Sequence, residues 1–391
     1  MSTFGALFVP APLREAVSDA AWLAAMLDVE RALVRAAAAA GFAPVDAAAA
    51  VAAQCDPALY DIEQLCEEGR AAGNPAEPLV RALRERVGGD AARWAHAGAT
   101  SQDVMDSAAM LVARNALGLI DDELEGVAAA CARLADEHRS TVMAARTLLQ
   151  QAVPTTFGLK AAGWLVDVLD ARLRLGRLTL PVQLGGAAGT LAVFGGSGVE
   201  IARLLADELD LAEPALPWHV HRGRIAELAG ALGAVASASA KIGLDVVLLA
   251  QTEVGEVEEA EGGVSSTLPQ KRNPIRAVLA RACACGVHAQ VPILTAGEHE
   301  LERAAGAWHA EWNALSEALA LAGGSAAAIR GCLDGLVVHP DRMRANMSDG
   351  LFAERDAFVE RGVLKSGADV DYLGSASVFV DRALARYRET Q

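Results

Sequence analysis

Apolar and small residues recur along this chain at alternating intervals of three and four positions. An alternation of three and four is a 3.5-residue repeat, which is typical of the seam between long helices packed at a shallow left-handed angle. One series steps through Ile225, Leu228, Leu232, Val235 and Ser239 and continues to Leu249. The pattern predicts long helices over four segments, which are residues 110–134, 159–173, 225–249 and 275–289.

The amino-acid composition supports a helical core. Hydrophobic residues make up 53% of the 391 residues but aromatic residues only 4%, so the core consists mainly of Ala, Leu and Val. Such side chains suit closely packed helices better than aromatic-rich sandwiches of strands. Strand signals are sparse, and stretches rich in Pro and Gly read as loops. We therefore predict an all-α fold with three parts: an N-terminal helical domain (1–105), a central bundle of long helices (106–344) and a short C-terminal helical domain (345–391).

The charge and the cysteines limit the partners and the compartment. The 34 Lys and Arg against 50 Asp and Glu give a net charge of -16, which makes nucleic acid and anionic membranes poor partners. Six cysteines show no disulfide spacing, and the N-terminus lacks a basic segment followed by an apolar run. The most apolar stretch, residues 226–251, contains charged residues, which argues against a membrane span. We expect a cytoplasmic protein with no nucleic-acid or membrane partner.

Three polar clusters stand at the edges of the predicted helices. The first comprises His96, Thr100, Ser101 and Asp103, directly before the first long helix. Thr100 with Asp103 resembles a capping box, with Asp in place of Glu or Gln. A helix start flanked by hydroxyls and an imidazole is also suited to binding a carboxylate. Both interpretations stand at this point.

The second cluster runs from Arg146 to Thr156 and contains Thr147 and Gln150. Pro154 suits the first turn of the second long helix, so this segment by itself predicts no more than a helix start.

The third cluster is a Gly- and Ser-rich loop, residues 262–274, that leads into the fourth predicted helix. Asn273 is expected to cap this helix, with Pro274 at its first position. Lys271 and Arg272 begin a run of cations without an intervening acid. A cationic helix start preceded by such a loop favours a small polyanion, and an ordinary surface loop is the alternative.

The third cluster resembles the signature of the fumarase/aspartase superfamily, Gly-Ser-Ser-x-Met-Pro-x-Lys-x-Asn-Pro, with Val264 in place of Gly and Leu268 in place of Met. The other two clusters match the remaining motif regions of that superfamily in order and spacing. By this resemblance, the catalytic residues are Ser265, which transfers the proton, Lys271 and His96. The resemblance assigns substrate binding to the residues Thr100, Ser101, Thr147, Gln150, Ser266, Lys271, Arg272 and Asn273.

The second cluster identifies the most similar branch of the superfamily. Many lyases carry Arg-Thr-His there, whereas this chain has Leu148, and Gln151 stands where some lyases have a further histidine. Cycloisomerases of the 3-carboxymuconate type also lack the Thr-His pair. Their Gln-Leu-Gly-Gly-Ala-Ala-Gly-Thr element is similar to residues 183–190, and their Pro-Trp-His element to residues 217–219.

This resemblance implies the lactonisation of 3-carboxy-cis,cis-muconate to 4-carboxymuconolactone, in protocatechuate (β-ketoadipate) catabolism, through an aci-carboxylate intermediate. It implies no cofactor and no metal, and His219 with His221 is a weak metal motif because no carboxylate or thiolate ligand accompanies it. One alternative is an adenylosuccinate-lyase-like C–N lyase that releases fumarate, and another is a non-catalytic structural protein on the same scaffold.

The length of the first long helix predicts an oligomer. About 33 residues, from Ser107 to Arg139, separate the first two clusters by about 50 Å in a helix. One subunit therefore cannot bring the two clusters together, whereas antiparallel packing of several subunits can. The resemblance implies a homotetramer whose sites draw on three chains.

Overall fold

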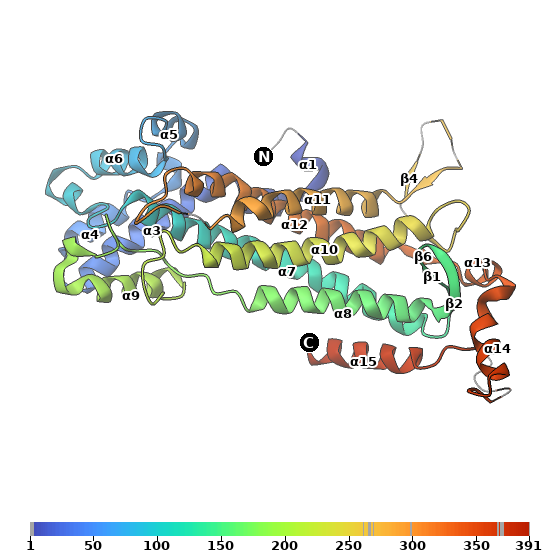
Figure 1. Cartoon of the computed structure of the whole chain (residues 1–391). Coiled ribbons are helices and arrows are strands. Elements are labelled where there is room, and N and C mark those ends of the chain that lie inside the picture. The colour runs from blue at the N-terminus through green and yellow to red at the C-terminus, as the bar shows by residue number, and fades with distance from the viewer. Residues whose placement is uncertain are drawn as a thin grey trace. The chain divides into compact units, whose positions relative to one another are not determined.

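A computed structural model describes residues 4–260, 262–264, 267–268, 270–297, 299–365, 367 and 371–390 of the chain. Helices dominate it and the strands are short (Figure 1). The α-helices are α1 (Gly5–Phe8), α2 (Ala11–Ala16), α3 (Asp19–Ala39), α4 (Val45–Ala52), α5 (Ile62–Gly69), α6 (Ala76–Val87), α7 (Ser101–Glu137), α8 (Phe157–Gly176), α9 (Gly198–Leu209), α10 (Gly223–Leu249), α11 (Ile275–Thr295), α12 (Ala307–Asp334), α13 (Pro340–Ala345), α14 (Ala353–Glu360) and α15 (Ala376–Glu389). The 3-10 helices are η1 (Pro57–Leu59), η2 (Gly89–Trp94), η3 (Ala192–Ser197) and η4 (Asp349–Phe352).

The strands form three antiparallel pairs. These are β1 (Val142–Thr147) with β2 (Gln150–Thr156), β3 (Val257–Glu259) with β6 (Leu336–Val338), and β4 (Gly263–Val264) with β5 (Arg272–Asn273). The prediction of an all-α fold is confirmed, because these pairs are small additions to a helical protein. The four helices predicted from the 3.5-residue repeats are α7, α8, α10 and α11. The helix α12 was not identified by a repeat.

The chain forms two compact units, and four long helices, α7, α10, α11 and α12, contribute residues to both. Unit 1 contains residues Met1–Leu119, Arg177–Leu232 and Gly286–Ala320. Inside it α3 packs against α4 and α9. The core face of α3 is mainly aliphatic, with side chains such as Leu23, Leu27 and Leu33, and it also buries Glu30. The Ser18 hydroxyl caps this helix by accepting from the Ala21 N–H at 3.2 Å.

Unit 2 contains residues Ile120–Gly176, Gly233–Cys285 and Leu321–Gln391. In it α15 runs alongside α8, and α13 contacts β1 (Figure 1). A buried polar contact holds α8 in place, because the indole N–H of Trp164 donates to Asp245 Oδ2 at 2.8 Å. The predicted domain boundaries at residues 105 and 344 do not coincide with the boundaries of these two units. The division into three domains stays a prediction.

Two predicted helix starts were wrong. Pro154 lies inside β2, opposite Ala144, and α8 begins at Phe157, where the Thr156 hydroxyl accepts from the Leu159 N–H at 3.1 Å. Asn273 lies in β5 and does not cap α11. The carboxylate of Glu259 takes that role, accepting from the N–H groups of Arg276 and Ala277 at 3.2 and 2.9 Å. A cap supplied from a distant strand leaves no signal beside the helix in the sequence.

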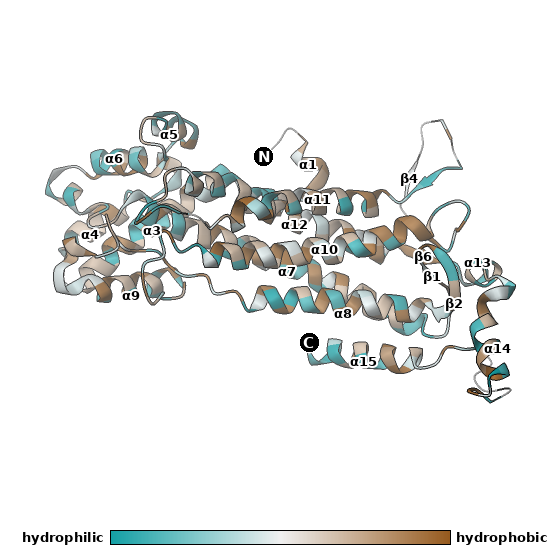
Figure 2. Cartoon of the chain, viewed as in Figure 1, coloured by the Kyte–Doolittle hydropathy of each residue, from teal (hydrophilic) through white to brown (hydrophobic). Residues whose placement is uncertain are grey.

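The predicted seam of α11 is exposed. Its residues Ile275, Val278, Ala282, Cys285 and Ala289 face outward, and the opposite face, with Ala277, Ala280 and Ala284, is buried. A helix that is apolar on both faces gives the sequence no basis for choosing between them. Figure 2 shows hydrophobic residues along much of α10 and α11. Both are long and apolar enough to cross a membrane by length and composition alone, but core helices of soluble proteins share these properties.

Candidate functional site

In unit 1, one carboxylate connects three sequence segments that were singled out above. Asp103, in the first turn of α7, accepts from the backbone N–H groups of Gly185 and Gly186, each at 2.9 Å, and contacts His219 Nε2 at 2.6 Å. Asp103 and His219 are both buried. The first cluster, the 183–190 segment and the 217–219 segment are therefore neighbours in the fold.

Further contacts fix the 183–190 segment beside α7. The Ser107 hydroxyl donates to the carbonyl of Gln183 and accepts from its N–H, at 3.0 and 2.9 Å. The Gln183 side chain accepts from the Trp218 N–H at 2.8 Å. Gly186 has a φ of +69°, and a Cβ there would lie 2.8 Å from the Gly98 carbonyl oxygen, so this approach requires glycine.

The capping prediction for Thr100 and Asp103 is confirmed in one direction. Asp103 Oδ2 accepts from the Thr100 N–H at 3.0 Å. The Thr100 and Ser101 hydroxyls have no hydrogen-bond partner among the residues that the structure describes, and both residues are partly exposed. They are therefore available to a ligand at the N-terminal end of α7, where the helix dipole favours an anion.

His96 sits in a left-handed backbone conformation, with φ at +61°. Its Nδ1 lies 2.6 Å from Glu30 Oε1, and Glu30 is fully buried on α3. Burial alone lowers the pKa of an imidazole, but the charge and hydrogen bond of Glu30 outweigh burial and raise the pKa of His96. The sequence singled out His96 but not Glu30, which lies 66 residues earlier in the chain.

A buried charge cluster at α7 was also missed from the sequence. The Arg222 guanidinium binds Asp106 with two contacts, at 2.8 and 3.0 Å, and also binds Glu311 on α12. The indole N–H of Trp308 donates to Asp106 at 3.0 Å. No sequence motif predicts this cluster, because its members are spread over about half of the chain.

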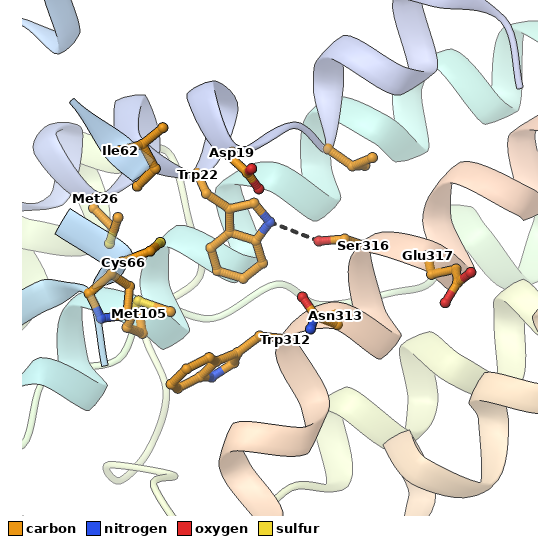
Figure 3. A pocket seen from close by; sticks show the side chains of 12 residues that line it. Asp19, Trp22, Met26, Ile62, Cys66, Met105, Trp312, Asn313, Ser316 and Glu317 are labelled. Atoms are coloured by element: carbon orange, nitrogen blue, oxygen red, sulfur yellow. Dashed lines mark hydrogen bonds between the residues drawn. The ribbon is translucent and has the colours of Figure 1, made fainter. Parts of the chain in front are cut away.

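A separate cavity of about 410 Å³ lies in unit 1 between α3, α5 and α12. Trp22, Met26, Met105 and Trp312 give it apolar walls, and the Trp22 indole N–H donates to the Ser316 hydroxyl at 2.8 Å (Figure 3). None of the residues predicted for the site lines this cavity.

In unit 2, the second cluster forms the tip of the β1–β2 hairpin. Thr147 pairs with Gln150, and the two-residue turn between them is Leu148–Leu149. Both leucines have a positive φ, +51° and +63°, and their side chains are 96% and 69% exposed. Thr147 and Gln150 are exposed as well. The tip of the hairpin therefore exposes two polar side chains and two leucines.

The base of this hairpin is anchored by Arg146. Its guanidinium binds the fully buried Glu256 through two contacts, at 3.0 and 2.7 Å, and Asn346 donates to the same carboxylate at 2.9 Å. Gln151 holds the neighbouring segment by donating to the Asn346 carbonyl at 2.7 Å. These contacts hold the base of the hairpin in place.

The third cluster is described in part. Ser265 and Ser266 lie outside the described residues. Lys271 is exposed, and Arg272 lies 3.8 Å from Glu258 in an exposed ion pair. The Asn273 side chain donates to the Gly263 carbonyl at 3.2 Å. Gln270, Arg272 and Asn273 line a cavity of about 200 Å³ together with Glu258, Glu259 and His339.

The described residues contain no group of three or more His, Cys, Asp and Glu side chains placed to hold a metal ion. The residues predicted for the site fall into two sets, one in each unit. Unit 1 holds His96, Thr100 and Ser101, and unit 2 holds Thr147, Gln150, Lys271, Arg272 and Asn273. Hydroxyls, amides and cations of this kind bind carboxylates and stabilise a negative charge that develops next to one.

Comparison with known proteins decides the family. Residues 9–289 match the protein family described as "Lyase". This chain belongs to the fumarase/aspartase superfamily. Members of this superfamily among its relatives are cycloisomerases and lyases, so the protein is an enzyme.

The chain is similar to named lyases and cycloisomerases along most of its length. A nitrosuccinate lyase from Streptomyces davaonensis is 48% identical over 353 residues, covering 86% of this chain and 74% of the relative. A 3-carboxy-cis,cis-muconate cycloisomerase from Pseudomonas aeruginosa is 45% identical over 354 residues, covering 88% and 77%. The crystal structure of the 3-carboxy-cis,cis-muconate lactonizing enzyme from Pseudomonas putida matches with a TM-score of 0.90 and 36% identity, covering 99% of both chains.

Proposed function

We propose that this superfamily member is a 3-carboxy-cis,cis-muconate cycloisomerase. In the reaction, one carboxylate of the substrate adds across a carbon–carbon double bond, and the adjacent carbon gains a proton. The ring closure forms a C–O bond, and the intermediate carries its extra negative charge on a second carboxylate as an aci-carboxylate. The product is the lactone 4-carboxymuconolactone. No group leaves, so no histidine is needed to protonate a leaving group.

The observation that carries this proposal is Leu148 at the exposed tip of the β1–β2 hairpin. Superfamily lyases with the Arg-Thr-His motif have an imidazole at this position, and an isobutyl group cannot exchange a proton. Three relatives that are named 3-carboxy-cis,cis-muconate cycloisomerases, with identities of 45%, 45% and 42%, support the same reaction. The adenylosuccinate-lyase-like and non-catalytic alternatives are not favoured.

The proposed roles of the site residues follow from their chemistry. Ser265 transfers the proton, and Lys271 stabilises the aci-carboxylate. His96, Thr100, Ser101, Thr147, Gln150, Ser266, Arg272 and Asn273 bind the three carboxylates. Lys271 is exposed, and among the described residues the Thr100 and Ser101 hydroxyls make no hydrogen bond, so these groups can donate to the substrate's carboxylates. Neither a metal nor an organic cofactor takes part in the proposed reaction.

The nitrosuccinate lyase relative favours a second candidate function. Its identity to this chain, 48%, is slightly above the 45% of the cycloisomerases. A nitrosuccinate lyase acts on a smaller dicarboxylate and breaks a C–N bond. The same carboxylate-binding groups and the same proton-transferring serine would serve this reaction, because both reactions pass through a carbanion beside a carboxylate.

A direct assay separates the two candidates. The purified enzyme is given enzymatically generated 3-carboxymuconate or nitrosuccinate, and both reactions are followed by ultraviolet absorbance. We expect loss of the muconate absorbance, with kcat/KM at least about 100-fold above that for nitrosuccinate. A clear preference for nitrosuccinate, with release of nitrite, would make the enzyme a lyase. Adenylosuccinate and argininosuccinate serve as negative controls.

We further propose a soluble, cytoplasmic homotetramer without a nucleic-acid or membrane partner. The outward face of α11 supports the proposal of an oligomer. Three large apolar residues are exposed there, Ile275, Val278 and Ile293, at 40%, 43% and 41%. An apolar face of this length is commonly covered by another protein surface. The net charge of -16 argues against an anionic membrane as the cover.

A further inference from the structure

The buried carboxylate of Glu30 has a single polar partner among the residues that the structure describes. Its Oε1 contacts His96 Nδ1 at 2.6 Å, and its Oε2 is buried without a hydrogen-bond partner among the residues that the structure describes. A buried carboxylate that is half satisfied in this way is costly in an apolar core. Glu30 is therefore poorly explained as a stabilising residue of α3, and its single contact points to a role through His96.

The surroundings of His96 favour its charged form. Burial opposes the charge, but the Glu30 carboxylate outweighs burial, and Asp103 adds a further attraction. Arg84 acts in the opposite direction, and its guanidinium is occupied by the Ala95 carbonyl at 3.2 and 3.1 Å. The balance raises the pKa of His96, so the imidazolium persists to higher pH than that of an isolated histidine.

The second ring nitrogen of His96 is free for a ligand. The structure gives Nε2 no partner among the described residues, and the side chain is 13% exposed. Nδ1 and Nε2 lie on opposite sides of the imidazole, so a ring held by Glu30 through Nδ1 directs Nε2 away from α3. His96 also lies four residues before Thr100 and its unengaged hydroxyl.

We propose that Glu30 is a positioning residue that holds His96 as an imidazolium, with the Nε2–H group donating to a carboxylate of the substrate. This inference rests on the proposed function, because it assigns the ligand of His96 to the substrate of that reaction. Glu30 does not touch the substrate. It fixes the direction of the ring and supplies the countercharge that keeps the ring protonated.

The first test is the Glu30→Gln variant, which keeps the shape and removes the charge. A charge-assisted hydrogen bond to the substrate would be weakened, and we expect kcat/KM near neutral pH to fall by about 10- to 100-fold. Activity that needs the imidazolium declines as the pH rises through the pKa of His96. Because the variant loses the raised pKa, this decline should begin at a lower pH than in the wild type.

Two further variants make the test specific. Asp28→Asn removes a carboxylate from the same helix, where it pairs with Arg31 and does not contact His96, and its pH profile should match the wild type. Glu30→Asp keeps the charge on a shorter side chain, so its basic limb should lie between those of Glu30→Gln and the wild type. A uniform loss of activity in Glu30→Gln, with an unmoved basic limb, would show a purely structural role and overturn the proposal.

A measurement without substrate separates this inference from the proposed function. The His96 ring is titrated by NMR with nitrogen-15-labelled histidine, and the His96→Gln variant assigns its signal. We expect the pKa of His96 to be lower in Glu30→Gln than in the wild type by about one unit or more. An equal pKa in both proteins would overturn the inference even if the cycloisomerase assay succeeds. Failure of that assay with a lowered pKa would overturn the proposed function alone.

Discussion

The carboxylate of Glu259 occupies the N–H groups at the start of α11, the place where an anionic ligand was expected. It accepts from Arg276 and Ala277, and it is buried. The neighbouring Asn273 is partly exposed and lines the 200 Å³ cavity, and its side chain donates to the Gly263 carbonyl. We therefore propose separate tasks for the two residues, with Glu259 stabilising the helix and Asn273 binding the substrate.

Substitution of each residue by alanine should separate stability from activity. Glu259→Ala leaves two N–H groups without their partner, and we expect a loss of about 2–3 kcal/mol in the free energy of unfolding. Asn273→Ala should cost less than about 1 kcal/mol and lower kcat/KM instead. Urea unfolding at a fixed protein concentration and steady-state kinetics measure the two effects. Equal losses of stability in both variants would contradict this assignment.

Some residues of the candidate site could be predicted from the sequence, and others could not. His96, Thr100 and Ser101 could be proposed from the sequence because they stand together at a helix start and match a motif. Glu30 was not found, because no local pattern connects it with a histidine 66 residues later. Asp103 was interpreted as a helix cap, and its contacts with Gly185, Gly186 and His219 depend on a chain path that only the fold defines.

At the scale of elements, the β1–β2 hairpin departs most from the expected structure. Its two-residue turn has a positive φ at both positions, which is the requirement of a type I′ turn and is normally met by Asn-Gly. Leucine in this conformation is unfavourable by about 1–2 kcal/mol per residue. The two leucines weaken their own turn, and strain of this kind persists where the side chain has a function.

Replacing Leu148–Leu149 by Asn-Gly should stabilise the hairpin and impair the enzyme. We expect local opening of β1 and β2 to become less favourable by about 1–3 kcal/mol, because Asn and Gly adopt the left-handed conformation readily, while the freedom of Gly in the open chain offsets part of the gain. Hydrogen exchange of the β1 and β2 amides measures this effect. We expect kcat/KM to fall at the same time, since the tip carries Thr147 and Gln150. Unchanged turnover would show that the leucines have no part in the site.

The helices were predicted from the sequence because their repeats are long, and the hairpin was missed because its signals are short. Eight members of one series run through α10 from Ile225 to Leu249, and such a run leaves little ambiguity. The hairpin lacks the Gly or Asn that marks a turn, and Pro154 suggested a helix start where β2 continues to Thr156. A proline in a strand at the edge of a small sheet loses few hydrogen bonds.

At the scale of the whole molecule, the proposed homotetramer would allow different chains to supply different parts of each site. Thr100 and Ser101 stand at the start of α7, whereas Thr147 and Gln150 follow its end. A helix of 37 residues is about 55 Å long. The exposed apolar face of α11 and the exposed hairpin tip are both surfaces that a second copy of the chain would cover. A tetramer with shared sites accounts for both features.

Mixed tetramers test this arrangement. Thr147→Ala and Ser265→Ala are each expected to be inactive, and sites that combine different chains would recover intact pairs when the two variants are mixed. With random exchange in equal amounts, roughly a quarter of the sites regain both residues, if these come from different chains. The control mixes Thr147→Ala with Gln150→Ala. Both changes lie in one hairpin, so no site becomes intact. Differently tagged subunits confirm that exchange took place. If verified mixed tetramers stay inactive, or if sedimentation shows a fully active monomer, Thr147 and Ser265 of one chain serve the same site and the shared-site arrangement is wrong.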